Sequence, residues 1–170
     1  MGKKASAEQP AIRCLPDRTS AGACARYLWA FPNTLIGLIL AVPVLLTGGR
    51  LEAVQGVLEL HGRLAAFALR RCVPLPGGAA AITFGHVVIG RDDYALATTR
   101  DHERVHVGQC ERWGPLFIPA YLVAAVWGLL ACGSAYSGNY FEREACSRSL
   151  TASTAPGAGK SDSRWPRARG

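Results

Sequence analysis

The sequence predicts an α+β fold that is mainly helical, with a small β-hairpin or sheet placed before three helices. Three observations support this prediction. Apolar residues make up 49 % of the 170 residues, which is enough for a folded core. Two apolar runs, at residues 28–47 and 116–132, have the length of helices. Between them, shorter segments within residues 54–90 alternate in the manner of strands.

The two ends of the chain are basic and show no hydrophobic period. Residues 1–26 are rich in Ala, Ser, Lys, Arg and Pro, and residues 151–170 are rich in Ser, Ala, Gly and Pro. We expect both ends to be disordered, which leaves residues 27–150 as a single membrane-associated domain. Many of the residues behind the net charge of +7 lie in these ends, where they either attract anionic lipid or are simply solvated. No basic face is interleaved with aromatic residues, so nucleic-acid binding is not expected.

The first apolar run, residues 28–47, reads LWAFPNTLIGLILAVPVLLT. It is about as long as the ~20 residues that cross a bilayer, although Pro32, Asn33 and Pro43 interrupt it. We interpret it as a membrane anchor or membrane-embedded helix, with a buried core helix as the alternative. The basic leader favours a cytoplasmic N-terminus.

The next segments are predicted from alternation and turn residues. Residues 54–60 are expected to form a strand, and residues 64–69 are apolar and can be helical. Residues 74–78, Pro-Leu-Pro-Gly-Gly, form a turn cluster. Residues 81–90 are expected to form a second strand that ends at Gly90 and the charged residues after it.

A helix is expected over residues 98–113, capped by the hydroxyl of Thr98 or Thr99. Asp101 and Glu103 would then lie in its first turn, where acidic groups suit the helix dipole. The helix should stop at Gly114-Pro115, before the apolar helix at 116–132 and a short Glu-bearing helix at 140–150.

The helix at 98–113 carries the sequence His-Glu-Arg-Val-His at residues 102–106. His102 and His106 are four residues apart, so both imidazoles lie on one face of the helix and can bind one zinc ion. Glu103 stands beside the first histidine, where its carboxylate can take a proton from metal-bound water. The pattern predicts a zinc site with Glu103 as general base.

A zinc site of this kind needs a third protein ligand. His61 and His86 lie in strand-like segments and are expected to be lone core or edge histidines. The better candidate follows downstream, in the sequence Glu-Arg-Glu-Ala at residues 142–145. A helix with Glu-x-x-Ala, a few dozen residues after His-Glu-x-x-His, resembles the glutamate-zincin (gluzincin) type of metallopeptidase.

The resemblance covers about residues 80–147 and is closest to small membrane-associated peptidases and uncharacterised proteins of that type. It implies that Glu142 is the third zinc ligand and that Ala145 packs closely. Cys146 stands where such families often have an Asp that orients a histidine. Glu144 is the alternative ligand.

Several other residues near the motif are candidates for roles around the site. Cys110 lies one turn beyond His106, but a straight helix cannot wrap three successive turns around one ion, so it is expected to be a core thiol. The six cysteines show no CxxC pair and are expected to be free and mostly buried. Gln109, Trp113 and Tyr136 could line a cleft, and Tyr136 or Tyr140 could stabilise an oxyanion.

Topology constrains how the second apolar run can lie. If residues 116–132 crossed a bilayer, Glu142 would emerge about 30 Å from His102 and could not bind the same ion. We therefore expect an up-down-up arrangement, in which the run packs against the active helix and the chain then returns to the site.

These observations predict a membrane-tethered, zinc-dependent peptide hydrolase that acts on a peptide or protein substrate and contacts membrane lipid. The alternative is a non-catalytic membrane-associated zinc-binding or structural protein. A third reading is a two-helix membrane protein in which the histidine motif is accidental.

Overall fold

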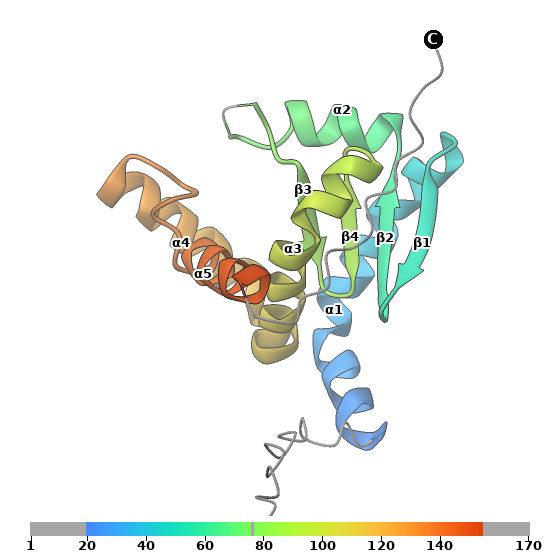
Figure 1. The fold of residues 1–170 in the computed structure, drawn as a ribbon, viewed down its shortest axis with the longest axis horizontal. Helices are drawn as coiled ribbons and strands as arrows, with labels where there is room; N and C mark the ends of the chain where they lie inside the picture. The colour runs from blue at the N-terminus through green and yellow to red at the C-terminus, as the bar shows by residue number, and fades with distance from the viewer. Residues whose placement is uncertain (1–19, 76, 155–170) are drawn as a thin grey trace, which may run out of the picture.

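The computed structural model describes residues 20–75 and 77–154; the remaining parts of the expected leader and tail lie outside the described residues. The predicted α+β class is confirmed, with helices around a small sheet (Figure 1). In chain order the elements are α1 (Ser20–Leu46), β1 (Arg50–Val54), β2 (Val57–His61), α2 (Arg63–Arg71), β3 (Ala81–Phe84), β4 (Val87–Gly90), α3 (Asp93–Trp113), the short 3₁₀ turn η1 (Gly114–Leu116), α4 (Phe117–Cys132) and α5 (Tyr140–Thr154).

The sheet has the strand order β1-β2-β4-β3 in the described part of the chain. Two antiparallel hairpins, β1–β2 and β3–β4, meet where β2 runs parallel to β4, with Leu58 opposite Val87. Helix α2 connects the hairpins, as a parallel pairing requires a crossover. The helix predicted at residues 64–69 is confirmed as part of α2.

Each segment predicted as a single strand contains the turn of a hairpin. The prediction of one strand at 54–60 is wrong because Gln55 and Gly56 both adopt positive φ, 50° and 80°, and turn the chain between β1 and β2. The prediction of one strand at 81–90 is wrong because Gly85, at φ 60°, turns the chain after Phe84. A Cβ at Gly85 would lie 2.2 Å from the Thr34 hydroxyl, so glycine also permits this turn to pack on α1.

Helix α1 begins at Ser20 rather than at Leu28, so residues 20–26 are helical and not part of an unstructured leader. One stripe of α1 is buried, and it consists of Ala30, Asn33, Gly37, Ala41 and Val44. The spacing of three and four residues places this stripe on one side of the helix, against the sheet and η1.

Helix α3 begins five residues before the predicted start, at Asp93 instead of 98. The carboxylate of Asp92 caps it by accepting a hydrogen bond from the backbone N–H of Ala95 at 2.8 Å. Thr98 and Thr99 are not caps, because their hydroxyls donate to backbone carbonyls three and four residues earlier within the helix. Asp101 and Glu103 therefore lie beyond the first turn, and the expected dipole interaction does not apply to them.

The second apolar run forms α4, and α5 returns beside it towards α3 (Figure 1). The return is as predicted, but α4 extends away from α3 and does not pack along it. Gly128 in α4 and Gly138 before α5 touch, since a Cβ on Gly128 would lie 2.7 Å from the carbonyl carbon of Gly138. The two glycines allow this tight return of the chain.

Candidate metal centre

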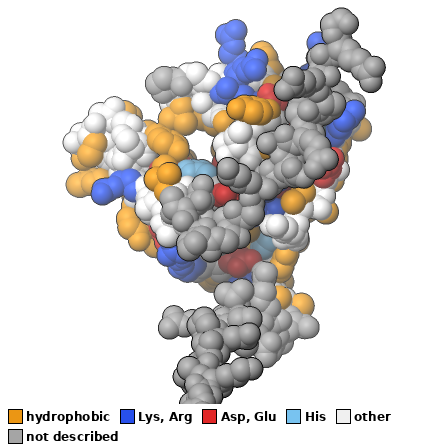
Figure 2. All heavy atoms as spheres, in the orientation of Figure 1, with side chains coloured by type: hydrophobic (Ala, Val, Ile, Leu, Met, Phe, Trp, Pro, Cys, Tyr) orange, Lys and Arg blue, Asp and Glu red, His pale blue; other side chains and the backbone are white. Residues whose placement is uncertain are grey.

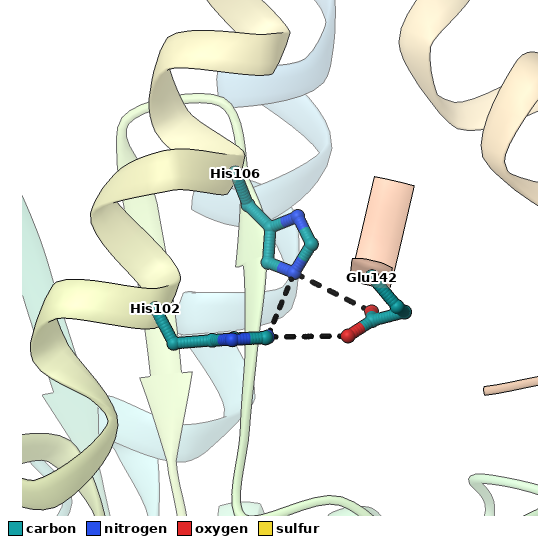
Figure 3. A group of neighbouring side chains, drawn as sticks. All are labelled: His102, His106 and Glu142. Atoms are coloured by element: carbon teal, nitrogen blue, oxygen red, sulfur yellow. Dashed lines mark hydrogen bonds and ion pairs between the residues drawn. The ribbon is translucent and has the colours of Figure 1, made fainter. Parts of the chain in front are cut away.

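The two histidines of the motif lie on one face of α3 and point at the same space (Figure 3). Their Nε2 atoms are 3.1 Å apart, and their rings are nearly perpendicular, at 80°. His106 is buried and His102 is partly buried. The helix period alone sets this arrangement, as the four-residue spacing predicts.

Glu142 from α5 closes the third side of this space (Figure 3). One carboxylate oxygen lies 3.1 Å from His102 Nε2, and the other lies 3.4 Å from His106 Nε2. The position of Glu142 depends on Asn139, whose side-chain oxygen accepts from the backbone N–H of Phe141 and so caps α5. The fully buried Asn139 also donates to the carbonyl of Tyr121, which ties the start of α5 to α4.

His102, His106 and Glu142 form a group that could hold a metal ion. Two ligand atoms at 2.0–2.1 Å from a tetrahedral zinc ion are about 3.3 Å apart. The Nε2 atoms of the histidines are 3.1 Å apart and lie 3.1 and 3.4 Å from the two different oxygens of Glu142. With one ligand atom taken from each residue, the three atoms lie within 4.8 Å of one another. Two nitrogens and a carboxylate also form a donor set that suits zinc.

Gln109 determines which nitrogen of His106 faces the centre. The side-chain amide of Gln109 donates to the carbonyl of Phe141 and to the carboxylate of Glu144, at 3.1 and 2.9 Å. Neither partner can donate, so the amide oxygen faces His106 Nδ1, at 2.8 Å. Nδ1 must then carry the hydrogen in the neutral imidazole, which leaves the lone pair on Nε2 for a metal ion.

Glu144 was the alternative third ligand, and it lies outside the group of potential ligands. Its carboxylate accepts from Gln109 and forms ion pairs with Arg112 at 3.2 Å and Arg148 at 2.8 Å. Burial alone would raise the pKa of Glu144, but the hydrogen bonds from Gln109 and Arg112 lower it on balance. Glu144 therefore supports the His106 imidazole through Gln109.

Glu103, the expected general base, is buried beside the histidines, with 5 % of its surface exposed. The hydroxyl of Thr83 on β3 donates to one of its carboxylate oxygens at 2.7 Å. Burial raises the pKa of Glu103, and the positive charges of His106 and His102 oppose that effect only in part. A raised pKa suits a carboxylate that both accepts and returns a proton near neutral pH.

The charges of the metal group are coupled. Burial acts to raise the pKa of Glu142, but hydrogen bonds from His102 and His106 outweigh it, so the pKa is well below its usual value. Burial acts to lower the pKa of His106, but the hydrogen bond and charge of Glu142 raise it on balance. Protons and a metal cation would therefore compete for the same side chains.

Two tyrosines contribute to the centre. The Tyr121 hydroxyl of α4 donates to Glu142 at 2.6 Å, a contact that the sequence analysis missed. The sequence signal for this contact is the hydroxyl of Tyr121 within the otherwise apolar run at residues 116–132. The Tyr136 hydroxyl lies 3.9 Å from the sulfur of Cys146, and burial together with the charge of Glu142 raises the pKa of Tyr136. Tyr140 is exposed and packs edge-on against Phe141, so it is not positioned as an oxyanion donor.

The other histidines lie outside the metal group, as predicted. His61 at the end of β2 pairs with Asp93 at 2.7 Å. His86 is buried, stacks on Tyr27 with ring centroids 3.9 Å apart, and contacts Glu111 at 3.2 Å.

The cysteines within the described residues are free. Cys110 is a fully buried core thiol, as predicted, and burial raises its pKa to about 12. The expectation that the thiols are mostly buried is wrong, because Cys24, Cys72 and Cys132 are exposed on the outer helices and their ends.

A charged cluster fixes α3 to the sheet. The buried carboxylate of Glu59 on β2 accepts two hydrogen bonds from Arg100, at 3.0 and 2.8 Å, and one from Arg104 at 3.2 Å. Arg104 lies within the histidine motif itself. The cluster therefore sets the rotation and height of the helix that presents His102 and His106.

The chain matches no known family model, no curated protein and no solved structure. The metal group and its surroundings are thus the basis for any functional conclusion.

Proposed function

We propose that the protein is a zinc-dependent peptide hydrolase associated with a membrane. The observation that carries this proposal is the convergence of His102, His106 and Glu142 on one metal-sized space, with the buried carboxylate of Glu103 beside it. The resemblance to gluzincins, carried by residues 102–106 and 142–145, points in the same direction.

The three ligands would hold zinc, which in such sites lowers the pKa of water and polarises a peptide carbonyl. Glu103 would accept the proton from the attacking water and deliver it to the departing amine, while Thr83 holds the other carboxylate oxygen in place. Tyr136 would donate a hydrogen bond to the oxyanion that develops on the carbonyl.

The substrate would be a peptide or protein, and lipid would be a second partner. The basic residues of the N-terminal segment favour a cytoplasmic N-terminus. With the active centre on that side, the substrate would be met at the cytoplasmic face of the membrane.

One observation favours a second function, a non-catalytic metal-binding protein. His106, Glu103 and Glu142 each expose less than a tenth of their surface, and a closed site is typical of structural zinc. In that case the ion would join α3 to α5 and contribute to folding.

Zinc content and peptide hydrolysis, measured on the parent and on Glu103→Gln, distinguish the two functions. The enzyme requires hydrolysis in the parent that falls by at least about a hundredfold in the variant, with zinc retained in both. Stoichiometric zinc in both proteins, with no turnover in either on a broad peptide library, would refute the hydrolase and favour the structural protein. Substoichiometric zinc that His102→Ala does not change would refute both.

A further inference from the structure

Two helical stretches are long and apolar enough to cross a membrane by length and composition, Gly22–Leu46 and Asp93–Cys132. The apolar part of the first contains no charge between Arg26 and Arg50, and the second none between Arg112 and Glu142. Whether either stretch can cross a membrane depends on which parts of the protein pack against it.

Large apolar side chains cover the side of α1 opposite its buried stripe. They are most exposed at Leu28, Ile39 and Leu46, where 75, 61 and 82 % of the surface is free. The outer side of α4 is similar, with exposed Leu122, Val123, Val126, Trp127 and Leu130. Figure 2 shows part of this apolar surface over α4, at the left of the view.

The other side of α1 lies along the sheet over most of its length. The Tyr27 hydroxyl donates to the carbonyl of Gly56, just before β2 begins. Val44 lies against Gly62, just after β2 ends. From 27 to 44 the helix rises about 26 Å, and from 56 to 62 the strand rises about 20 Å. Helix α1 and strand β2 therefore extend side by side over the same stretch, so a bilayer that α1 crossed would also contain β2.

This packing excludes a transmembrane α1. If residues 28–46 crossed the hydrocarbon, the paired residues Glu52 and Glu59 near the middle of β1 and β2 would lie at mid-depth. Glu52 is exposed, and β1 is an edge strand whose outer backbone groups have no strand partner among residues 20–75 and 77–154. Exposed carboxylates and open sheet edges are not tolerated in hydrocarbon.

The packing of α5 beside α4 likewise excludes a transmembrane α4. Helix α5 returns beside α4 from Gly138, and it carries exposed Arg143 and Arg148 as well as Glu142 of the metal group. A bilayer around α4 would enclose this charged helix, which the cost of burying charge in lipid forbids.

We infer that the protein is monotopic, with α1 and α4 lying in one leaflet of a lipid bilayer and exposing their outer apolar sides to acyl chains. Arg26, Arg50 and Arg112 stand at the ends of the charge-free stretches. Arg50 is exposed, so an anionic headgroup would meet it there, whereas Arg26 and Arg112 already pair with Glu111 and Glu144. Both ends of each helix and the metal centre then lie on the same side of the membrane. This inference uses the packing alone and holds whether or not the protein hydrolyses peptides.

Cysteine labelling tests the sidedness. Three variants of the full chain each keep one exposed reporter: native Cys24 before the apolar part of α1, native Cys72 after it, or Ser137→Cys after α4. Every other cysteine of the chain becomes serine except Cys110, which is fully buried. Expressed in bacteria, each is treated with a charged, impermeant maleimide in spheroplasts and in sealed inverted vesicles, with detergent-dissolved membranes as the reference for full labelling.

A monotopic protein gives the same sidedness for all three reporters. Opposite sidedness of Cys24 and Cys72 would show that α1 crosses, and opposite sidedness of Cys72 and the residue at 137 would show that the 93–132 stretch crosses; either result overturns the inference. Recovery of the parent protein in the soluble fraction would overturn it as well.

A second measurement tests lipid contact by the outer side of α1. The variant Ile39→Asp places a charge at the centre of that side, and Tyr94→Asp is the control at a position on α3 that is more exposed, 78 % against 61 %. Flotation with vesicles of phosphatidylcholine and phosphatidylglycerol should fall more than about tenfold for Ile39→Asp. It should change less than about twofold for Tyr94→Asp. Equal binding of the two variants would overturn the assignment.

Discussion

Replacement of Gln109 by Leu should weaken zinc binding and folding together. The substitution removes three hydrogen bonds from a fully buried side chain of similar size. The carbonyl of Phe141 and Nδ1–H of His106 are then left unpaired in the interior, at about 1–3 kcal/mol each. Glu144 loses less, because Arg112 and Arg148 still pair with it near the surface. We expect about 2–5 kcal/mol of lost stability in the metal-free protein.

Gln109→Leu should weaken zinc binding through the imidazole of His106. Without an acceptor at Nδ1, His106 can adopt the tautomer with hydrogen on Nε2, which removes the lone pair from the metal. Loss of such a partner typically costs 10- to 100-fold in metal affinity. The affinity is measured by competition with a chromophoric zinc chelator, and folding of each variant is checked by urea denaturation.

A charge-exchanged double variant separates the two effects. In Gln109→Glu with Glu144→Gln, the new carboxylate still accepts from His106 Nδ1, and the new amide at 144 can donate to that carboxylate. Zinc affinity should then stay at or above that of the parent, although the carbonyl of Phe141 still lacks a donor and stability falls. The reasoning is refuted if Gln109→Leu binds zinc within about twofold of the parent, or if the double variant binds as weakly as Gln109→Leu.

Three further predictions follow from the same contacts. The contribution of the Glu142–His106 pair to the stability of the metal-free protein should be greatest between their ordinary pKa values, about 4.5 and 6.5. The contribution of Glu142 is lost as pH falls from 4.5 through its lowered pKa, and that of His106 is lost as pH rises from 6.5 through its raised pKa. Zinc affinity should rise over the same upper range because protons no longer compete; thermal melts with and without zinc from pH 4 to 9 test both, and a zinc affinity independent of pH would contradict the coupling. Gly128→Ala should cost about 1–3 kcal/mol and weaken zinc binding, since its Cβ meets the backbone of Gly138 at 2.7 Å, whereas Gly108→Ala, with open space around it, should be neutral or stabilising; equal urea midpoints for the two variants would contradict the close-packing argument. Arg100→Met should cost about 1–2 kcal/mol, a figure reduced for the partial exposure of Arg100, and exposed Arg63→Met should cost almost nothing; equal urea midpoints would show that the Glu59 cluster does not hold α3.

The sequence predicted those parts of the fold and site that depend on local spacing. The four-residue interval between His102 and His106 determines their common face in any α-helix, so the pair could be predicted without tertiary information. Glu142 required more, because its place depends on the cap at Asn139 and on the return past Gly128 and Gly138. The resemblance to gluzincins suggested Glu142, and the local sequence alone does not favour it over Glu144.

The errors in the strands and in α3 have local causes that were misjudged. Gln55 at positive φ is unusual for a residue with a side chain, so the first hairpin had only Gly56 as a signal. Gly85 was included in an apolar strand although a glycine there could equally mark a turn. Asp92 follows the apolar segment at 81–90 directly, but its carboxylate caps α3 by accepting from the N–H of Ala95, three residues later, which Thr98 and Thr99 do not do.

Helix α4 shows why composition alone could not settle the relation to the membrane. Its outer side is apolar throughout, and that side alone would fit a transmembrane helix. Its inner side packs Phe117 against His106 and places the Tyr121 hydroxyl on Glu142. In the monotopic arrangement that we propose, a helix with lipid on one side and a buried carboxylate on the other would lie at the boundary between them. The metal centre and the apolar surface would then constrain each other, since Glu142 could reach the histidines only if α4 remained on their side of the bilayer.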